Sequence, residues 1–249
     1  MHFTSETSSN GVVERTFLLD DVTGVLWSPE SGSAGAPLLL LGHSGGMHKR
    51  APGLVATALH GVIDHGFTVV AIDAPGHGDR ERSDTDRQRG EAIQRARAAG
   101  EPIAPIVADH SVSIAERAVP EWQSTLDALQ ALPGIDSSVP VGFGGMMLGV
   151  ATGMMLTAAD TRIGAVGFGA VFVNDALLDA ARQVTVPVEY RIPWDDEHLD
   201  RGAALALFDA FASGEKSLHA RSGRIHPAPD HERADSVRFF ARHLSPSSR

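Results

Sequence analysis

The chain has 249 residues, of which 43% are hydrophobic, and its formal net charge is −10. This length allows one sizeable core and is short for two, so we expect a single domain over residues 1–249. The negative charge would repel phosphate groups, which argues against nucleic acid or an anionic membrane as a partner. The sequence contains no cysteine, which excludes a disulfide framework, a thiolate nucleophile and a cysteine-ligated metal.

The N-terminal stretch MHFTSETSSNG is polar and lacks the basic-then-apolar layout of a signal peptide. No apolar run approaches the roughly 18 residues needed to span a bilayer. We therefore expect a cytoplasmic protein that acts on a small-molecule substrate.

Short apolar runs alternate with amphipathic segments along the chain, a pattern typical of a mostly parallel sheet covered by helices. The expected strands are Val12–Leu19, Thr23–Ser28, Pro37–Gly42, Phe67–Ile72, Val139–Phe143, Ile163–Phe168, Pro187–Ile192 and Ser217–Ala220. The first two should form an antiparallel pair. The expected helices are Leu54–His65, Trp122–Leu132, Gly149–Ala159, Asn174–Gln183, Ala204–Phe211 and Val237–Leu244.

Residues 81–112 interrupt this alternation, because they carry many charges and only scattered apolar side chains. Two interpretations stay open for them. The segment is either a solvated helix with a linker, or a small cap over a binding pocket.

In an open α/β sheet, ligands bind beyond the carboxyl ends of the strands, so the residues that follow each expected strand are the candidates for a site. The segments found there are GHSGG from Gly42, DAPGHGDR from Asp73, GGMMLG from Gly144, WDDEH from Trp194 and GRIH from Gly223. Four motifs together, in this order and spacing, carry a family resemblance: GHSGG with the following His48, Lys49 and Arg50, the DAPGHGDR loop, WDDE followed by a helix, and a late histidine before the terminal helix.

From about Val12 to Leu244 the chain resembles the α/β-hydrolase superfamily, in particular its compact dienelactone-hydrolase-like esterases. The resemblance implies a mostly parallel central sheet flanked by helices and a catalytic triad of nucleophile, acid and histidine. It also implies hydrolysis of a small ester or lactone without a cofactor. Edge strands and the terminal helix are common dimer surfaces in this fold, so by analogy a homodimer is open.

Hydrolases of this fold carry their nucleophile in G-x-S-x-G at a sharp strand-to-helix turn. The matching stretch here runs from Gly145 to Gly149 and puts Met147 in the nucleophile position. A shifted alignment from Gly142 to Met146 would put glycine there and lose the second glycine. A thioether has no proton for a base to remove, so Met147 cannot be activated as a serine is. It could instead fill the pocket floor. A methionine introduced in place of serine would have the same consequence.

The resemblance assigns the triad acid to Asp196, with Asp195 as the alternative, and the histidine to His226. Asp196 could otherwise cap a helix that starts near Leu199, and His226 could be an ordinary surface histidine. The spacing before His226 is slightly longer than in those esterases. An Asp–His pair would still provide a general base near neutral pH.

The resemblance also implies backbone N–H donors for a developing oxyanion, from Ser44 or Gly45 and from Leu148. A plain glycine-rich turn is the alternative for the first of these segments, and the Ser44 hydroxyl could act as a displaced nucleophile. The same pocket would include His43 and Trp194. The histidines and acids His43, His77, Asp79 and His198 do not match a metal-ligand spacing, so we expect no metal.

Two functions are compatible with these residues. In the first, His226 is a general base that activates water against an ester or lactone, or abstracts a substrate proton for elimination, isomerisation, ring closure or reaction with oxygen. In the second, the chain is a hydrolase-like binding protein without chemistry. A structural or assembly role is a third, weaker interpretation.

Overall fold

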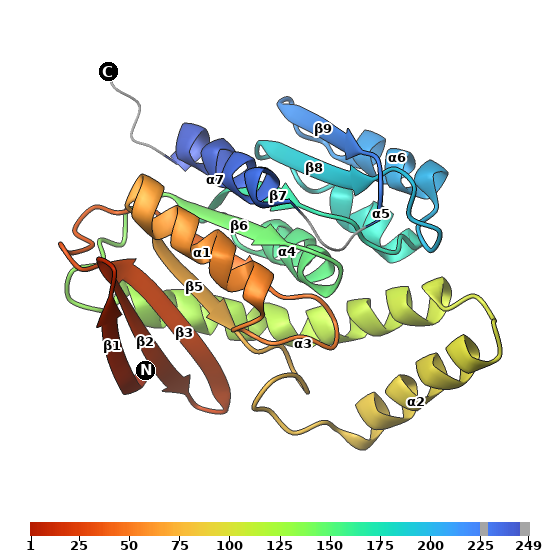
Figure 1. The fold of residues 1–249 in the computed structure, drawn as a ribbon, viewed down its shortest axis with the longest axis horizontal. Helices are drawn as coiled ribbons and strands as arrows, with labels where there is room; N and C mark the ends of the chain where they lie inside the picture. Colours follow the sequence, from red (N-terminus) through yellow and green to blue (C-terminus); the bar gives the residue numbers. More distant parts are fainter. Residues whose placement is uncertain (225–228, 245–249) are drawn as a thin grey trace.

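The computed structural model describes residues 1–224 and 229–244. Within them, nine strands form one sheet in the order β1-β2-β3-β5-β4-β6-β7-β8-β9, shown in Figure 1. The strands are β1 (His2–Ser9), β2 (Val12–Leu19), β3 (Val22–Pro29), β4 (Leu38–Gly42), β5 (Thr68–Ile72), β6 (Val141–Gly145), β7 (Ile163–Phe168), β8 (Val188–Pro193) and β9 (Lys216–Arg221). The helices are α1 (Pro52–His65), α2 (Asp84–Ala98), α3 (Ala104–Gln130), α4 (Leu148–Ala159), α5 (Asp175–Ala181), α6 (Arg201–Ala210) and α7 (Asp230–Leu244).

The first three strands and the contact between β3 and β5 are antiparallel, and the rest of the sheet is parallel. The predicted antiparallel pair is confirmed as β2 and β3. Strand β4 lies between β5 and β6, so the chain leaves β4 toward one neighbour and later returns on the other side. Such a switch point leaves a crevice beyond the strand ends, where ligands bind in sheets of this kind.

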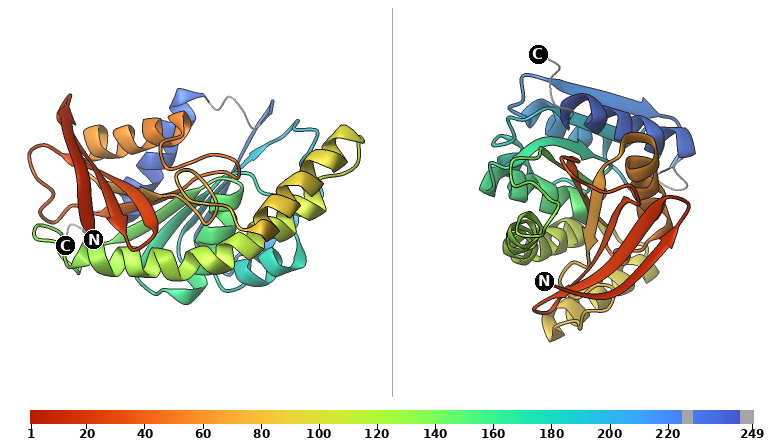
Figure 2. Two further views of the ribbon diagram at one scale, coloured as in Figure 1. Left: turned by 90° about the horizontal axis from the view of Figure 1, so that it is seen from below. Right: turned by 90° about the vertical axis from the view of Figure 1, so that its left-hand side faces the viewer.

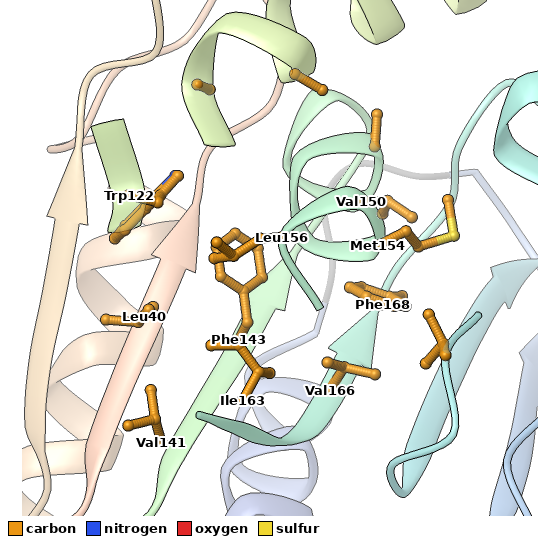
Figure 3. Packing of buried hydrophobic residues seen from close by; sticks show 14 of the residues in the cluster. Leu40, Trp122, Val141, Phe143, Val150, Met154, Leu156, Ile163, Val166 and Phe168 are labelled. Carbon is orange, nitrogen blue, oxygen red and sulfur yellow. The ribbon is translucent and has the colours of Figure 1, made fainter. Parts of the chain in front are cut away.

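Helices cover both faces of the sheet because the buried strands are apolar on both sides. Figure 2 shows α1 and α7 on one face of the sheet and α3 on the other. Along β4, Leu39 and Leu41 pack toward α1 and α7, whereas Leu38 and Leu40 pack toward α3 and α4. On the second face, Phe143 of β6 meets Trp122 of α3 edge-on, with ring centroids 5.4 Å apart (Figure 3). None of the described helices is both long and apolar enough to cross a bilayer.

The polar N-terminal stretch forms strand β1, which the sequence pattern did not predict as a strand. It pairs with β2 at the edge of the sheet, and most of its side chains are exposed. The turn between them places Asn10 at φ 52° and Gly11 at φ 78°, as in a tight two-residue hairpin. Pairing with β2, rather than burial, therefore defines this strand.

The charged segment 81–112 forms α2 and the first part of α3. Ser83 starts α2, because its hydroxyl accepts a hydrogen bond from the Asp86 N–H. Helix α3 is continuous over 27 residues and passes through Pro120, so the predicted helix from Trp122 is the last third of a longer one. In Figure 1, α2 and the beginning of α3 extend past the carboxyl ends of the parallel strands.

Candidate active site

Met147 lies at a sharp bend between β6 and α4. Its backbone has φ 52° and ψ −111°, a conformation that a residue with a side chain rarely adopts. Such strain costs about 1–3 kcal/mol and persists only where the surroundings enforce it. The Met147 N–H donates to the carbonyl oxygen of Ala170, in the loop after β7, at 2.8 Å, and this hydrogen bond holds the bend. A sharp, strained strand-to-helix turn is also the feature that carries the nucleophile in the hydrolases that the sequence resembles.

The two glycines of this turn allow the strand, the helix and β4 to approach closely. A Cβ atom on Gly145 would lie 2.6 Å from the Gly149 carbonyl carbon, and one on Gly149 would lie 2.4 Å from the Gly42 carbonyl oxygen. Real Cβ atoms do not come so near to backbone, so neither position accepts a side chain. This packing agrees with the alignment from Gly145 to Gly149.

Backbone donors without partners surround the bend. Leu148 is the first residue of α4, and its N–H makes no hydrogen bond within the described chain. The same holds for the N–H groups of Ser44 and Gly45, in the loop after β4. The Ser44 hydroxyl lies 3.5 Å from the Met146 carbonyl oxygen, which places this loop beside the bend. A helix N-terminus and such N–H groups favour negative charge.

His43 fastens the loop after β4 to the loop after β5. Its Nδ1 donates to the Ser44 carbonyl oxygen at 2.9 Å, and its Nε2 accepts from the Ala74 N–H at 3.0 Å. Burial lowers the pKa of His43 to about 4, so the ring is neutral near pH 7. The sequence placed His43 among substrate-binding residues. In the structure both ring nitrogens bind the protein, so it positions the Ser44 loop.

A buried ion pair that the sequence analysis did not assign joins the same two loops. The Lys49 ammonium lies 2.5 Å from the Asp73 carboxylate and 2.6 Å from that of Asp79. The side chains of Lys49 and Asp73 are 3% and 0% exposed. Asp73 also accepts from the Lys49 N–H, the Asp79 N–H and the Thr23 hydroxyl. Burial by itself would raise the pKa of Asp73, but these hydrogen bonds hold it below its ordinary value.

The loop after β8 holds the predicted acids. Asp195 Oδ2 accepts from the Gly223 N–H at 2.9 Å, which ties this loop to the end of β9. Asp196 Oδ1 accepts from the His198 N–H at 3.0 Å. Helix α6 is capped by Asp200, not by Asp196, because Asp200 accepts from the Ala203 N–H. The capping role considered for Asp196 is therefore wrong.

Two further predicted residues belong to this region. Trp194 is 38% exposed, and the guanidinium of Arg201 lies 5.0 Å from its ring centroid. His226 lies outside the described residues, so its pairing with Asp196 stays a prediction.

The histidines and acids considered for a metal have other partners. Asp79 binds Lys49, and His77 Nδ1 lies 3.0 Å from the Pro75 carbonyl oxygen. Among the residues that the structure describes, no group of three or more histidines and acids could hold a metal ion.

Comparisons with known proteins place this arrangement among solved structures. No protein-family model matches the chain, and no curated protein does. The chain is 29% identical to a cold-adapted esterase from an Arctic intertidal metagenomic library, in a PEG-bound structure, with a TM-score of 0.77 over 98% of this chain and 100% of that chain. Acetyl xylan esterase from Paenibacillus sp. R4 is 12% identical, with a TM-score of 0.65 over 98% of this chain and 88% of that chain. An esterase of Pyrococcus furiosus is 11% identical, with a TM-score of 0.67 over 98% of this chain and 93% of that chain.

These similarities cover nearly the whole chain. They agree with the mostly parallel sheet, the helices on both faces and the strained turn after β6. The chain therefore has the α/β-hydrolase fold.

Proposed function

We propose that the chain is an enzyme that acts on a small ester or lactone by acid–base chemistry, without a covalent acyl-enzyme. In this proposal His226 is the general base and Asp196 orients it, while the amides of Leu148 and of Ser44 or Gly45 bind the carbonyl oxygen. The similarity at 26–29% identity to one cold-adapted esterase, in three structures, supports the substrate class. Placement among dienelactone-hydrolase-like esterases is part of the same proposal.

The strained backbone of Met147 is the observation that carries this proposal. A turn of this kind is costly, yet here it is retained although its residue cannot attack a carbonyl. What the turn still provides is the Leu148 N–H, without a partner in the described chain, at the start of a helix. Retention of the turn therefore favours a role in stabilising negative charge on a substrate oxygen.

Without a nucleophile, the base must act on water or on the substrate itself. A water deprotonated by His226 would add to the ester carbonyl, and the backbone donors would stabilise the resulting oxyanion. The same base could instead remove a substrate proton in an elimination, isomerisation or ring closure. Triad removal in other hydrolases lowers turnover roughly 10⁶-fold, so direct hydrolysis should be slow, and proton transfer is the more favourable use of such a site.

A ligand-binding protein without catalysis is the second candidate. It is favoured by Met147 itself, because an adaptable, half-buried thioether at the turn can line an apolar pocket. The two functions differ in whether His226 is required.

Restoring the nucleophile tests the proposed oxyanion site and base. We expect Met147→Ser to hydrolyse 4-nitrophenyl acetate at least about 100-fold faster than Met147→Ala, because one missing donor or base costs a comparable factor elsewhere. Adding His226→Ala to Met147→Ser should remove this gain. A folded Met147→Ser protein with no gain would contradict the proposal and favour the binding protein.

The unsubstituted chain tests the reaction itself. Any ester, lactone or isomerisation substrate that the unsubstituted chain turns over should lose its turnover in His226→Ala and in Asp196→Ala. Full turnover in the folded His226→Ala protein would remove His226 from the mechanism.

A further inference from the structure

Met147 is a methionine at the candidate site that solvent can reach. The residue is half-buried, whereas Met154 of the following helix is 0% exposed. The side chain of Met146 lies against Gly169, because a Cβ atom on that glycine would be only 2.7 Å from the Met146 Cγ. Peroxides convert an accessible methionine into its sulfoxide, which is polar and chiral. Met147 is therefore open to a reaction that turns an apolar side chain into a hydrogen-bond acceptor.

Next to Met147, backbone donors lack an acceptor. The N–H groups of Leu148, Ser44 and Gly45 make no hydrogen bond within the described chain. The two segments that carry them are adjacent, since the Ser44 hydroxyl lies 3.5 Å from the Met146 carbonyl oxygen. A thioether sulfur is only a weak acceptor. In its reduced form Met147 therefore offers these donors no strong partner.

A sulfoxide at this position has the atom sequence of the intermediate that such donors stabilise. In a serine hydrolase the acyl carbon is bonded to the serine oxygen, and the oxyanion is bonded to that carbon. In oxidised Met147 the sulfur is bonded to Cγ, and the sulfoxide oxygen is bonded to the sulfur. Both oxygens lie the same number of bonds beyond Cβ, on a pyramidal centre, and both carry negative charge. The sulfoxide oxygen thus reaches the region that an oxyanion would occupy.

We propose that Met147 is a site of oxidation by a hydroperoxide, and that the N–H groups of Leu148 and of Ser44 or Gly45 bind the resulting sulfoxide oxygen. A lone pair of the sulfur forms the new S–O bond while the O–O bond of the peroxide breaks. The proton of the transferred oxygen passes to the departing oxygen, which leaves as water or as an alcohol. The sulfur is oxidised and the peroxide is reduced.

The inference rests on the backbone donors of the proposed function and adds regulation to that site. A sulfoxide oxygen bound to these donors occupies the place of a substrate carbonyl oxygen, so the oxidised chain binds such substrates more weakly. Neither His226 nor Asp196 takes part in the oxidation.

The stability of the oxidised chain tests the proposal. The full chain carrying Met47→Leu, which removes a methionine that is 41% exposed, is treated with hydrogen peroxide until peptide mass spectrometry detects oxidation. We expect Met147 sulfoxide to form and to raise the urea midpoint by roughly 0.3 M or more, the shift that one net hydrogen bond produces. The same treatment of Met47→Leu/Met147→Leu should give no such rise. A sulfoxide buried without donors lowers stability instead.

Substitution by glutamine tests the same contact without an oxidant. The glutamine Oε1 lies the same number of bonds beyond Cβ as the sulfoxide oxygen, so Met147→Gln should have a higher urea midpoint than Met147→Leu. Met155, which is half-buried on α4 and packs against the core, is the matched control. Met155→Gln should have a lower midpoint than Met155→Leu, because its amide is buried without such donors. Far-ultraviolet circular dichroism checks that each variant is folded.

Three results overturn the proposal. They are the absence of Met147 sulfoxide after treatment, a smaller rise, no change or a fall of the midpoint on oxidation, and a midpoint of Met147→Gln that does not exceed that of Met147→Leu. The outcomes also separate this inference from the proposed function. If Met147→Ser gains no esterase activity while oxidation raises the midpoint, the proposed chemistry fails and the oxidation site stands. If esterase activity appears and oxidation lowers the midpoint, the reverse holds.

Discussion

At Met147 the backbone conformation is strained, whereas the side chain cannot take part in nucleophilic catalysis. The backbone holds a left-handed conformation with φ 52°, which glycine adopts at little cost and a residue with a Cβ does not. The side chain cannot be a nucleophile toward a carbonyl. The free energy of the backbone strain can therefore be measured by unfolding experiments, without an activity assay.

We predict that Met147→Gly is more stable than Met147→Ala by about 1–2 kcal/mol, because glycine relieves the strain of a positive φ. Urea unfolding of the two variants measures the difference. The control is Ala158→Gly, at an exposed position in the last turn of α4, which should lower stability by up to about 1 kcal/mol. A Met147→Gly protein less stable than Met147→Ala would show that the bend is not strained.

His43 makes the fold sensitive to acid. Its pKa is about 4 in the folded chain and 6.5 for the unperturbed side chain, so between these values the unfolded chain binds a proton that the folded chain does not. The contribution of neutral His43 to the free energy of unfolding is full above pH 6.5 and falls as the pH drops toward 4. A shift of this size corresponds to about 3 kcal/mol.

We expect His43→Asn to be less stable at pH 7, because the Ala74 N–H loses its acceptor, and to lose less stability than the parent chain between pH 6.5 and 4. Unfolding free energies at several pH values test this expectation. His2→Asn, at an exposed position, is the control and should leave the pH profile unchanged. Parallel profiles for the parent and His43→Asn would rule out this role for His43.

At the scale of elements, α1 and α7 are joined through one histidine. His60 Nδ1 lies 2.8 Å from the Asp64 carboxylate, and Nε2 lies 3.4 Å from that of Asp230 at the start of α7. The hydrogen bond to Asp64 raises the pKa of His60 above its ordinary value, and Asp230 adds to the effect. This contact therefore holds the start of α7 against α1.

We predict that the His60 contact stabilises the fold fully at pH values below the ordinary pKa of histidine. This stabilisation is lost as the pH rises through the raised pKa of His60. His60→Gln should therefore destabilise the protein more at pH 5.5 than at pH 8.5, in chemical unfolding. His65→Gln, in the last turn of the same helix, is the matched control. An equal loss for His60→Gln at both pH values would show that the ion pair contributes nothing.

Elements with strong apolar patterns were predicted closely, and those defined by pairing were not. The strand Ile163–Phe168 has the predicted bounds, because a continuous apolar run in a parallel sheet is buried on both faces. Strand β1 is exposed and polar, so no burial pattern marks it; the Asn10-Gly11 turn was the signal that could have revealed it. Helix α3 begins at Ala104 because its first turns lie against α2, a contact that no local pattern encodes.

At the scale of the molecule, the Lys49–Asp73 pair connects three parts of the sheet region. It joins the loop after β4, the loop after β5 and, through the Thr23 hydroxyl, strand β3. Both loops border the strained turn. Buried pairs of this kind are sensitive to loss of one partner, because the other charge is left uncompensated.

We predict that Lys49→Met and Asp73→Asn each lower the free energy of unfolding by about 3 kcal/mol or more, and that the double variant costs less than the sum of the two. Unfolding measurements on the four proteins of this cycle give the coupling. Arg15→Met, which removes an exposed ion pair with Glu6, should cost less than about 1 kcal/mol. Additive losses at Lys49 and Asp73 would show that the two side chains do not act as a pair.

The sequence by itself determined the fold class, the order of most strands and helices, and the position of Met147 at the turn after β6. It could do so because runs of apolar residues and the spacing of glycines are local features of the chain. Only the tertiary structure decided that His43 supports a loop and that Lys49 and Asp73 form a buried pair. Those roles depend on which side chains are brought together and removed from water, and residues far apart in the sequence carry no local mark of either.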